Sequence, residues 1–331
     1  MNNLAVVDKS VSGGHRNLRV HYLHDCVADD QALVAEGMAA SKPWLHPKFF
    51  YDTAGSELFD AITETEEYYP TRTEAEIFDR HLDDMLAHVA NRQVLVEPGS
   101  GNCGKAEQFL RDPKLSHYAP IEISADFLVG CCNRLARAHP DLTVDAICGD
   151  FTRCQTLPAA VPESGRLLFF PGSTIGNFDP ESAQDLLANF RSLAGSEGYL
   201  LIGTDLPKDR GVLEAAYNDS QGFTRRFNLN ILDHLNDRLD CHFHAADFDH
   251  DAFYNEDLGR IEMHLVCVRD TRVRVGEKHF NLSKGESIHT ENSYKYAPDS
   301  FVAMASTVGF EPVTYWTDSR QWFAVHLLRA C

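Results

Sequence analysis

Long apolar runs and clustered basic residues are both missing from this sequence. No apolar run reaches the length that a membrane crossing needs. The 331 residues are 44% hydrophobic and 24% charged, as in a soluble globular protein. Lysine and arginine total 30 against 49 aspartate and glutamate residues, which gives a formal net charge of −19. A phosphate backbone or an anionic membrane surface attracts clustered positive charge, so we expect neither as a partner and favour a small molecule.

Targeting signals and metal-site patterns are also missing. Residues 1–9 lack the apolar core of a secretion signal, so we expect a cytoplasmic protein. The nine cysteines form no CxxC pair, which predicts neither a zinc ribbon nor a disulfide framework. His242, His244, Asp247 and His250 lie close together in the sequence, but their spacing matches no metal-site template, and we predict no metal site.

Residues 73–206 alternate helical and strand patterns, which predicts an α/β fold with a parallel sheet covered by helices. Thr73 and Glu76 have the spacing of a capping box at the start of the first helix. Phe127 begins the apolar stripe of the second helix, and Gly195 ends the third. The predicted helices cover residues 73–89, 127–135 and 183–193, and the predicted strands cover residues 94–97, 118–123, 142–148, 166–170 and 199–203.

An acidic residue and a glycine turn end the first predicted strand, in the run VLVEPGSG. Gly99 and Gly101 let the backbone approach a nucleotide-like ligand closely, while Glu97 would repel a pyrophosphate and attract a cation. Glu122 and Asp150 follow the next two apolar runs. Three carboxylates at consecutive strand ends suit ribose hydroxyls, an adenine amine and a sulfonium charge. The pattern therefore favours S-adenosylmethionine as the cofactor.

Two other nucleotide sites compete with this interpretation. The glycine turn ends in Lys105 like a phosphate loop, but the next residue is Ala106, which cannot ligate magnesium and so disfavours an ATPase. The spacing from the turn to Glu122 fits NAD as well as S-adenosylmethionine. Asp150 and Phe151 favour the latter, because a carboxylate can accept from an adenine amine while the ring stacks on adenine. A helix cap and a core phenylalanine are the alternative interpretation of this pair.

The C-terminal part of the chain predicts an antiparallel hairpin formed by residues 312–316 and 321–328. A doubly wound sheet finished by such a hairpin resembles the class I methyltransferases. Two segments do not fit the strand–helix rhythm, and we expect them to meet in space as a second, family-specific substrate-binding domain. The predicted domains are residues 73–206 with 295–331, which bind the cofactor, and residues 1–72 with 207–294, which close over the substrate.

The run from Phe49 to Arg72, FFYDTAGSELFDAITETEEYYPTR, closely resembles the histidine-specific Nα-methyltransferases. Those enzymes make hercynine, the betaine precursor of ergothioneine. The likeness covers nearly the whole chain beyond residue 40, with its motifs in the same order. The further motifs are EPGSG at 97–101, PGSTIGNF at 171–178, FNLN at 227–230, RIEMHL at 260–265 and TENSYK at 290–295.

The resemblance implies a methyltransferase domain that carries the cofactor and a second domain that supplies most of the amino-acid pocket. Pro98 within the glycine turn and Glu122, where aspartate is common, depart from the family pattern and leave the fine geometry open. By resemblance, the substrate positions are Tyr51, Phe59, Tyr68, Gly172, Asn177, Tyr217, Met263, Glu291 and Ser293, and the cofactor positions are Gly99, Gly101, Lys105, Glu122, Asp150 and Phe151.

Glu291 and Ser293 are suited to recognise an imidazole ring. In an extended segment both side chains point to the same side, so the carboxylate can accept from one ring N–H while the hydroxyl meets the other nitrogen. A helix cap is the alternative interpretation of the pair. Asn177 and Tyr217 can hold the substrate carboxylate through an amide and a hydroxyl, or they are an ordinary turn residue and a half-buried aromatic.

Tyr51 and Tyr68 are the predicted catalytic residues, because their phenolic oxygens can lie against the substrate amine while it loses protons. Phe59 and Met263 would form apolar walls, although core packing explains them equally well. Lys105 is predicted to reach the cofactor carboxylate, and a solvated lysine at a helix start would look the same.

Methyl transfer to a neutral amine is an in-line displacement, so we expect positioning to be the main contribution to catalysis, with solvent or a tyrosine accepting the proton. The predicted function is S-adenosylmethionine-dependent Nα-methylation of L-histidine, repeated until hercynine is formed, in ergothioneine biosynthesis. Two alternatives stay open: an N-methyltransferase for another aromatic amino acid such as tryptophan, and a non-catalytic sensor of S-adenosylmethionine or histidine. We expect a monomer.

Overall fold

The main element of the fold is an eight-stranded sheet, seen in the computed structural model, which describes residues 15–23, 28–89 and 92–331. Its first six strands are parallel, and its last two form an antiparallel hairpin. The strand order is β1 (Leu18–Tyr22), β4 (Thr143–Cys148), β3 (His117–Glu122), β2 (Val94–Pro98), β5 (Arg166–Phe170), β6 (Tyr199–Asp205), β14 (Phe323–Ala330) and β13 (Phe310–Thr317). The predicted wound sheet with a terminal hairpin is confirmed.

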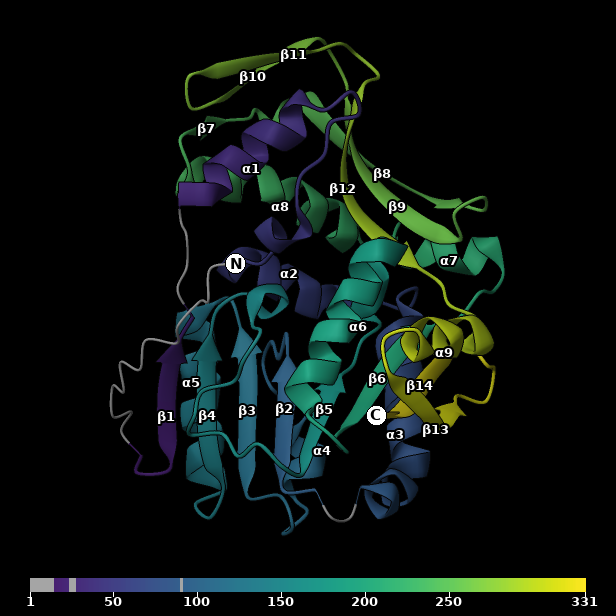
Figure 1. Ribbon diagram of the computed structural model, residues 1–331. Helices are drawn as coiled ribbons and strands as arrows, with labels where there is room; N and C mark the ends of the chain where they lie inside the picture. The colour runs from purple at the N-terminus through teal and green to yellow at the C-terminus, as the bar shows by residue number, and fades with distance from the viewer. Residues whose placement is uncertain (1–14, 24–27, 90–91) are drawn as a thin grey trace.

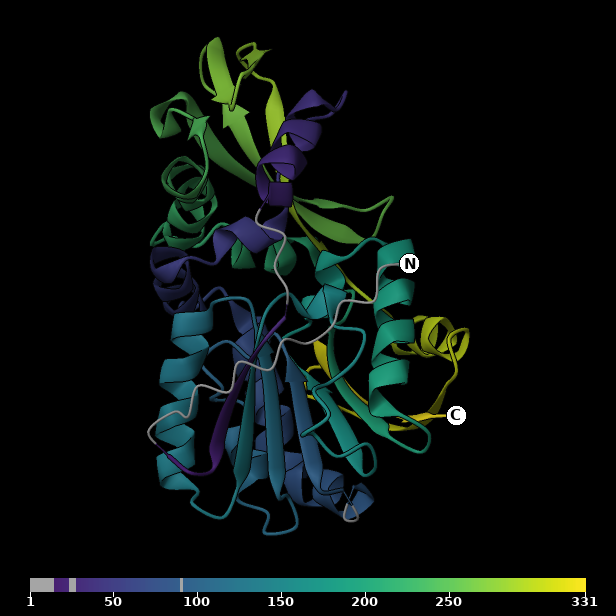
Figure 2. The same cartoon turned by 60° about the vertical axis from the view of Figure 1, so that its left-hand side comes forward.

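Helices cover both faces of this sheet (Figures 1 and 2). Neighbouring strand residues such as Leu95 and Val96 enter cores on opposite faces, which explains why the central strands read as continuous apolar runs. The first core contains α3 (Tyr69–His88), α4 (Glu107–Leu110) and α5 (Ala125–Ala138), and the second contains α6 (Pro180–Ala194) and α9 (Pro298–Ser306).

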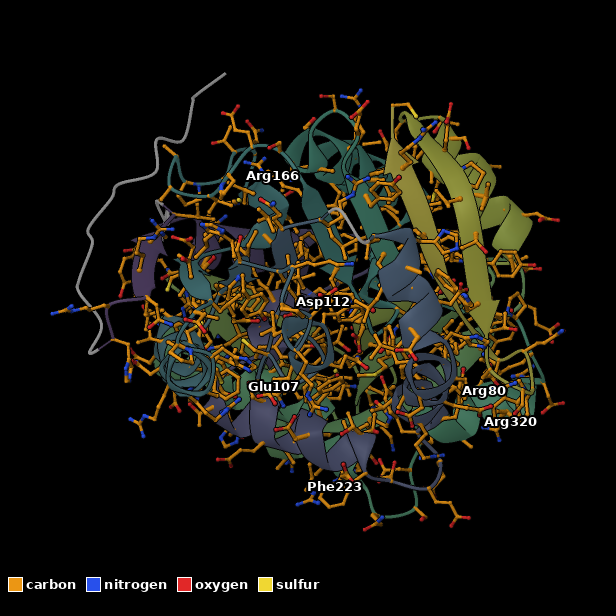
Figure 3. The ribbon with its side chains drawn as sticks, turned by 90° about the horizontal axis from the view of Figure 1, so that it is seen from below. Arg80, Glu107, Asp112, Arg166, Phe223 and Arg320 are labelled. Carbon is orange, nitrogen blue, oxygen red and sulfur yellow. The ribbon has the colours of Figure 1, made fainter. Side chains whose placement is uncertain are left out.

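The order of the strands reverses between β2 and β5, whose neighbours on the far sides are β3 and β6. At such a switch point the loops that leave the carboxyl ends of the strands turn away from each other, and ligands bind there. At the opposite edge of the sheet, where the strands begin, Arg166 starts β5. Its side chain donates hydrogen bonds to the carbonyls of Val161, Pro162 and Leu193 and so joins the loop before β5 to the end of α6. Figure 3 labels this arginine in the view from below.

A second layer lies above the carboxyl ends of the parallel strands (Figure 1). It has its own apolar core, in which Phe50 and Phe227 stack with ring centroids 4.5 Å apart. Its helices are α1 (Ala28–Ala39), η1 (Pro47–Phe50), α2 (Thr53–Thr63), α7 (Arg210–Ala216), α8 (Phe223–Arg238) and η4 (Ala245–Asp247). Its two antiparallel sheets are β12 (Ser287–Tyr294), β9 (Arg260–Cys267) and β8 (Phe248–Asn255), and β11 (Lys278–Leu282), β10 (Thr271–Val275) and β7 (Cys241–His242).

The predicted domain boundaries stay a prediction, but one element of residues 1–72 does not lie in the second layer. Strand β1 pairs in parallel with β4, with Leu18 opposite Val144, and so forms an edge of the main sheet. Arg19 and His21 of this strand reach Asp145 on β4, at 2.6 and 2.8 Å. The polar pairing explains why β1 lacks the apolar run of a central strand.

Two details of the first predicted helices are wrong. Helix α3 begins at Tyr69 with Pro70 in its first turn, so Thr73 lies inside the helix and its hydroxyl donates to the carbonyls of Tyr69 and Pro70. There is no capping box, because Glu76 instead accepts from the Ser319 amide. Phe127 of α5 is 38% exposed and is not part of the core.

The remaining predicted helices and strands are present with small shifts at their ends. Gly195 ends α6 with φ 73° and ψ 179°, a positive-φ conformation that favours glycine. Among the described cysteines all are free, and only Cys331 is exposed. Within the described residues, none of the helices combines the length and the apolar character needed to cross a bilayer.

Candidate functional site

The glycine turn after β2 is held against the next strand by backbone hydrogen bonds. The amides of Gly99 and Ser100 donate to the carbonyl of Ile121, at 2.8 and 3.2 Å. Gly99 and Gly101 have φ of 65° and 51°, values that residues other than glycine rarely adopt. A Cβ atom added to Gly99 would lie 3.3 Å from the ring of Phe151. The turn therefore provides a close-fitting backbone surface beside an aromatic ring.

Glu122, at the end of β3, is tied to this turn. Its carboxylate accepts from the amide of Gly101 at 3.0 Å and from the amide of Ile123 at 2.8 Å. A carboxylate has about four acceptor positions, so Glu122 retains capacity for ligand hydroxyls. Its predicted contact with the cofactor ribose stays a prediction.

Glu97 does not take the role expected from the sequence. Its side chain points into the protein, where the residue is 1% exposed and accepts a hydrogen bond from the hydroxyl of Tyr118. Burial raises the pKa of the Glu97 carboxyl well above its usual value. The argument that Glu97 presents a negative charge to the ligand is therefore wrong, and of the three predicted strand-end carboxylates Glu122 and Asp150 remain as candidates at this edge.

Asp150 and Phe151 follow β4 and start the short helix η2 (Phe151–Arg153). Asp150 caps it by accepting from the Thr152 amide at 2.9 Å, so the cap interpretation of this residue is confirmed. Phe151 packs edge-on against Phe170, with centroids 5.5 Å apart, beside Gly99. The ring is therefore placed next to the glycine turn, as an adenine-stacking residue must be.

Lys105 makes a specific ion pair and is not a freely solvated side chain. Its Nζ lies 2.6 Å from Glu74, a residue of α3 whose side chain is only 2% exposed. The same carboxylate accepts from the amide of Gly172 at 2.7 Å. Sequence analysis missed Glu74, although an acidic residue on the buried stripe of a helix was a signal for it. Glu74 thus joins α3, the glycine turn and the loop after β5.

The residues of this edge fit S-adenosylmethionine. Gly99 and Gly101 both have positive φ, and Gly99 leaves space beside Phe151 that a Cβ would fill. A Cβ on Gly172 would lie 3.2 Å from the ammonium of Lys105. A cationic group and a nearby glycine amide suit a carboxylate, and the carboxylates of Glu122 and Asp150 suit hydroxyl and amine donors. When bound, this cofactor supplies an electrophilic methyl carbon on a positive sulfur.

A cavity of about 620 Å³, including the part open to solvent, lies between the main sheet and the second layer. All nine predicted substrate residues line it: Tyr51, Phe59, Tyr68, Gly172, Asn177, Tyr217, Met263, Glu291 and Ser293. Sequence analysis missed its other lining residues: Ile62, Pro70, Ser173, Thr174, Asp205, Ala216, Thr224 and Phe227. The structure therefore brings the predicted set together, while the role of each residue stays a prediction.

One wall of the cavity is aromatic. Phe59 lies edge-on to Tyr51 and Tyr68, with ring centroids 6.1 and 6.2 Å away. Neither phenolic oxygen of these two tyrosines hydrogen-bonds to any described residue, so both remain available to a ligand. Burial raises the pKa of Tyr51 and of Tyr68 well above the usual value, which keeps the phenols neutral. They are suited to hydrogen bonding with an amine and poorly suited to act as phenolate bases.

The facing wall is polar, and two hydrogen bonds organise it. Asn177, at the end of η3 (Thr174–Asn177), donates to Glu291 at 2.9 Å, and Tyr217 donates to Ser293 at 2.7 Å. Each pair combines a residue predicted to hold the substrate carboxylate with one predicted to recognise the ring. The alternative interpretation of Asn177 as a left-handed turn residue is wrong, because Gly172 and Ser173 are the residues with positive φ in this loop.

Glu291 and Ser293 both lie on strand β12, opposite Met263 and Ile261 of β9. The helix-cap interpretation of this pair is wrong, since helix α9 begins only at Pro298. Burial raises the pKa of Glu291 to about 7, against the lowering effects of Lys295 and of the Asn177 hydrogen bond. The carboxyl group therefore changes charge near neutral pH.

Buried charges support this polar wall from behind. Lys295 lies 2.7 Å from Asp205, and neither side chain is more than 1% exposed. Asp205 also accepts from the hydroxyl of Tyr69 at 2.6 Å and pairs with Lys208. Sequence analysis did not identify this cluster, although Asp205 follows an apolar strand as Glu122 does.

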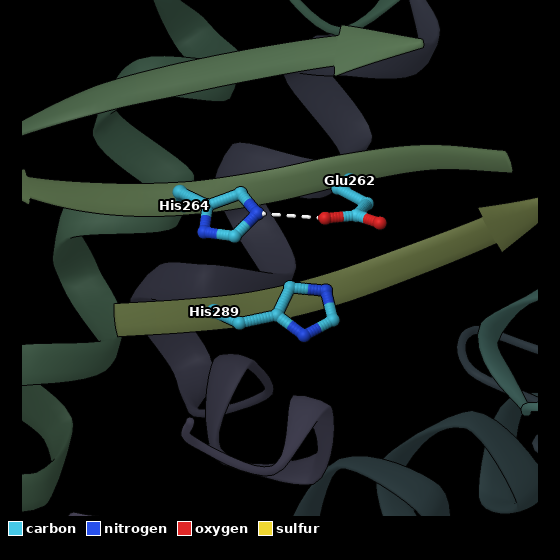
Figure 4. A group of neighbouring side chains, drawn as sticks. All are labelled: Glu262, His264 and His289. Carbon is cyan, nitrogen blue, oxygen red and sulfur yellow. Dashed lines mark hydrogen bonds and ion pairs between the residues drawn. The ribbon is translucent and has the colours of Figure 1, made fainter. Parts of the chain in front are cut away.

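Among the described residues, the histidine-rich segment near β8 brings no three possible metal ligands close together. Asp247 pairs with Arg269 at 2.5 Å, whereas the ring of His250 bonds to Asn228 and to the carbonyl of Tyr217. In the part of the chain that the structure describes, such a group is formed by Glu262, His264 and His289, whose ligand atoms lie within 4.8 Å of one another (Figure 4).

An ion is not needed to explain that group. Arg260 already neutralises Glu262 at 2.7 Å, and His264 bonds to the same carboxylate at 3.0 Å. The rings of His264 and His289 are stacked with an interplanar angle of 24°, and a ring nitrogen of His289 already bonds to the carbonyl of Glu291 at 3.0 Å.

The strand order, the left-handed glycine turn and the cavity at the switch point define a class I S-adenosylmethionine-dependent methyltransferase. A family profile described as "Histidine-specific methyltransferase, SAM-dependent" matches residues 29–330. The chain belongs to this family.

Known relatives agree with this assignment. The histidine N-alpha-methyltransferase of Mycolicibacterium smegmatis is 37% identical over 301 residues, which cover 89% of this chain and 92% of the relative. Ergothioneine biosynthesis protein 1 of Neurospora crassa is 29% identical and covers 84% of this chain, which matches 32% of that longer protein. An N-methyltransferase of Aspergillus flavus is 24% identical over 92% of this chain and 83% of its own length.

Proposed function

We propose that this chain methylates the α-amine of L-histidine successively to hercynine, in ergothioneine biosynthesis, with S-adenosylmethionine as the methyl donor. The family and the names of the bacterial and Neurospora relatives support the substrate and the pathway. The position of Gly172 between the cavity and the cofactor edge is the observation that carries the proposal. It lines the cavity, and its amide binds the same Glu74 carboxylate that holds Lys105 beside the glycine turn. The cofactor edge and the cavity therefore share a boundary at which a methyl group can be passed.

The residues contribute mainly by binding and orienting the substrate. Holding the amine in line with the methyl carbon makes the displacement effectively unimolecular, which is the largest effect that a site without a strong base can supply. Tyr51 and Tyr68 offer neutral phenols to the amine, and their rings with that of Phe59 favour the growing cation. We propose that solvent accepts the displaced proton, because both phenols are held neutral.

The polar wall supports histidine as the substrate. Glu291 offers an acceptor and Ser293 a hydroxyl on one side of the same strand, which suits a ring with one N–H and one bare nitrogen. Indole has only an N–H donor, so a tryptophan-like substrate would leave one partner unused. The second layer, residues 1–72 and 207–294 in the predicted division, is proposed to act as the substrate domain, and the protein is proposed to be a monomer.

Incubation with L-histidine and S-adenosylmethionine tests the proposal directly. Mass spectrometry should show histidine gaining one, two and then three methyl groups, with fragmentation placing them on the α-nitrogen. Tryptophan in place of histidine should give little product. Tight binding of both ligands without any methylated product would instead support the sensor, and faster methylation of tryptophan would overturn the substrate. Light scattering tests the monomer.

A further inference from the structure

Lys295 is a fully buried lysine directly behind the polar wall of the cavity. Its ammonium lies 2.7 Å from Asp205, 2.6 Å from the hydroxyl oxygen of Ser293 and 3.5 Å from that of Tyr217. The side chain of Lys295 is 0% exposed, so it cannot itself touch a ligand in the cavity. Any hydrogen-bonding influence that it has on the substrate must therefore pass through the two hydroxyls, while its charge also lowers the pKa of Glu291.

The hydrogen bonds of Ser293 can be counted. An ammonium group donates only, so the Ser293 oxygen must accept from Lys295. The same oxygen accepts from the Tyr217 hydroxyl at 2.7 Å, which fills both lone pairs. In the described residues no acceptor is in place for the hydrogen of Ser293 itself, and this side chain lines the cavity.

When a substrate carboxylate takes the Tyr217 hydrogen, one lone pair of Ser293 is released, but the ammonium of Lys295 still polarises the Ser293 hydroxyl and favours donation of its hydrogen. Lys295 still donates to Ser293, and it stands within 3.5 Å of the Tyr217 oxygen. Each hydroxyl then has its own hydrogen directed to the ligand. Without Lys295 no positive charge opposes an N–H that points at the Ser293 oxygen, so the hydroxyl could rotate to accept such an N–H instead.

We propose that Lys295 is a positioning residue that fixes the Ser293 hydroxyl as a hydrogen-bond donor and thereby restricts the pocket to a neutral azole ring with a bare nitrogen at Ser293. The inference rests on the proposed function and deepens it. Glu291 accepts from the N–H on the other side of the ring. Glu291 therefore recognises the ring N–H, and Ser293 recognises the bare ring nitrogen. Lys208 is the second lysine partner of Asp205, but its other partners are Tyr69 and the carbonyl of Leu206.

The two pyrrole analogues of L-histidine provide the test, because each keeps one ring N–H and replaces the other nitrogen by C–H. Calorimetric titrations of the full chain saturated with S-adenosylhomocysteine would give the affinity for histidine and for both analogues. The native protein should prefer histidine by about tenfold or more over the analogue that faces Ser293 with C–H, since a buried donor is left unpaired.

Lys295→Met should reduce that preference to about two- or threefold, because the released Ser293 hydroxyl can turn to Tyr217. Lys208→Met is the matched control, because it also removes a lysine partner of Asp205, and it should keep the native preference. Thermal unfolding would verify that each variant is folded. If Lys295→Met does not fold, Lys295→Gln takes its place, since the amide oxygen can accept the Ser293 hydrogen and should give the same loss of preference.

A native preference that persists in the folded Lys295 variant would overturn the inference, and so would an equal loss in Lys208→Met. Failure of the native chain to bind or methylate histidine at all would instead overturn the proposed function. The two failures are therefore distinguishable, because the inference depends only on the ratio of affinities within chains that bind histidine.

Discussion

The Asn177 amide donates to the Glu291 carboxylate across 2.9 Å, so a residue after β5 is joined to a residue of β12 at the wall of the cavity. The contact links the main sheet to the second layer. It also satisfies one acceptor site of a buried carboxyl group, which would otherwise be costly to keep charged. A ligand that binds here must either share Glu291 with Asn177 or take its place.

Glu291→Ala should weaken histidine binding much more than cofactor binding. Removing a hydrogen bond to a charged acceptor costs about 2 kcal/mol, which is roughly thirtyfold in affinity. Calorimetry with histidine and, separately, with S-adenosylhomocysteine measures both effects. Glu291→Gln is the control for side-chain volume and should lose less. Unchanged histidine affinity in the alanine variant would remove Glu291 from ring recognition.

The raised pKa of Glu291 predicts a pH dependence of stability in the ligand-free protein. Between the unfolded value of 4.5 and the folded value of about 7, the folded chain holds a proton that the unfolded chain has released. Stability relative to Glu291→Gln should therefore fall as the pH rises through this window, by roughly 3 kcal/mol at most, and level off above it. Urea unfolding of both proteins from pH 4 to pH 8 measures the difference. A constant difference would show that the pKa is not raised.

Sequence patterns predicted the buried strands because parallel strands covered on both faces are continuous apolar runs. Strand β1 escaped prediction, because its Arg19 and His21 are satisfied by Asp145, a partner more than a hundred residues away. Helix α3 begins four residues before the apparent capping box, since Pro70 in its first turn outweighed that local signal.

The site was predictable mainly where the resemblance supplied motifs. The structure adds what those motifs cannot contain, namely which side chains meet. Glu74 binds Lys105 and Gly172 across 31 and 98 residues of sequence, and Lys295 meets Asp205 only after the two layers have packed. Glu97 was wrongly predicted to face the ligand from its position at a strand end. Its carboxylate points inward and accepts a hydrogen bond from Tyr118.

Glu74→Gln should weaken cofactor binding by about tenfold, although Glu74 is not expected to touch the cofactor. The neutral amide would loosen its pair with Lys105 and change the bond to the Gly172 amide, both of which border the glycine turn. Titration with S-adenosylhomocysteine measures the loss. Glu76→Gln, on the same helix but at a partly exposed position facing Arg80, is the matched control and should bind normally. Equal affinities for the two variants would contradict the role of Glu74.

Gly99→Ala should separate backbone strain from ligand binding, because Gly259 has the same φ of 65° far from the cofactor edge. A left-handed alanine costs about 1 kcal/mol at either position, so both variants should lose at least that much stability in urea unfolding, with the larger loss in Gly99→Ala. Only at Gly99 does the new Cβ meet a ring, 3.3 Å away in Phe151, whereas at Gly259 nothing lies within 4 Å. Cofactor affinity should therefore fall several-fold in Gly99→Ala and stay native in Gly259→Ala. Native cofactor affinity in Gly99→Ala would show that the turn after β2 does not form the cofactor site.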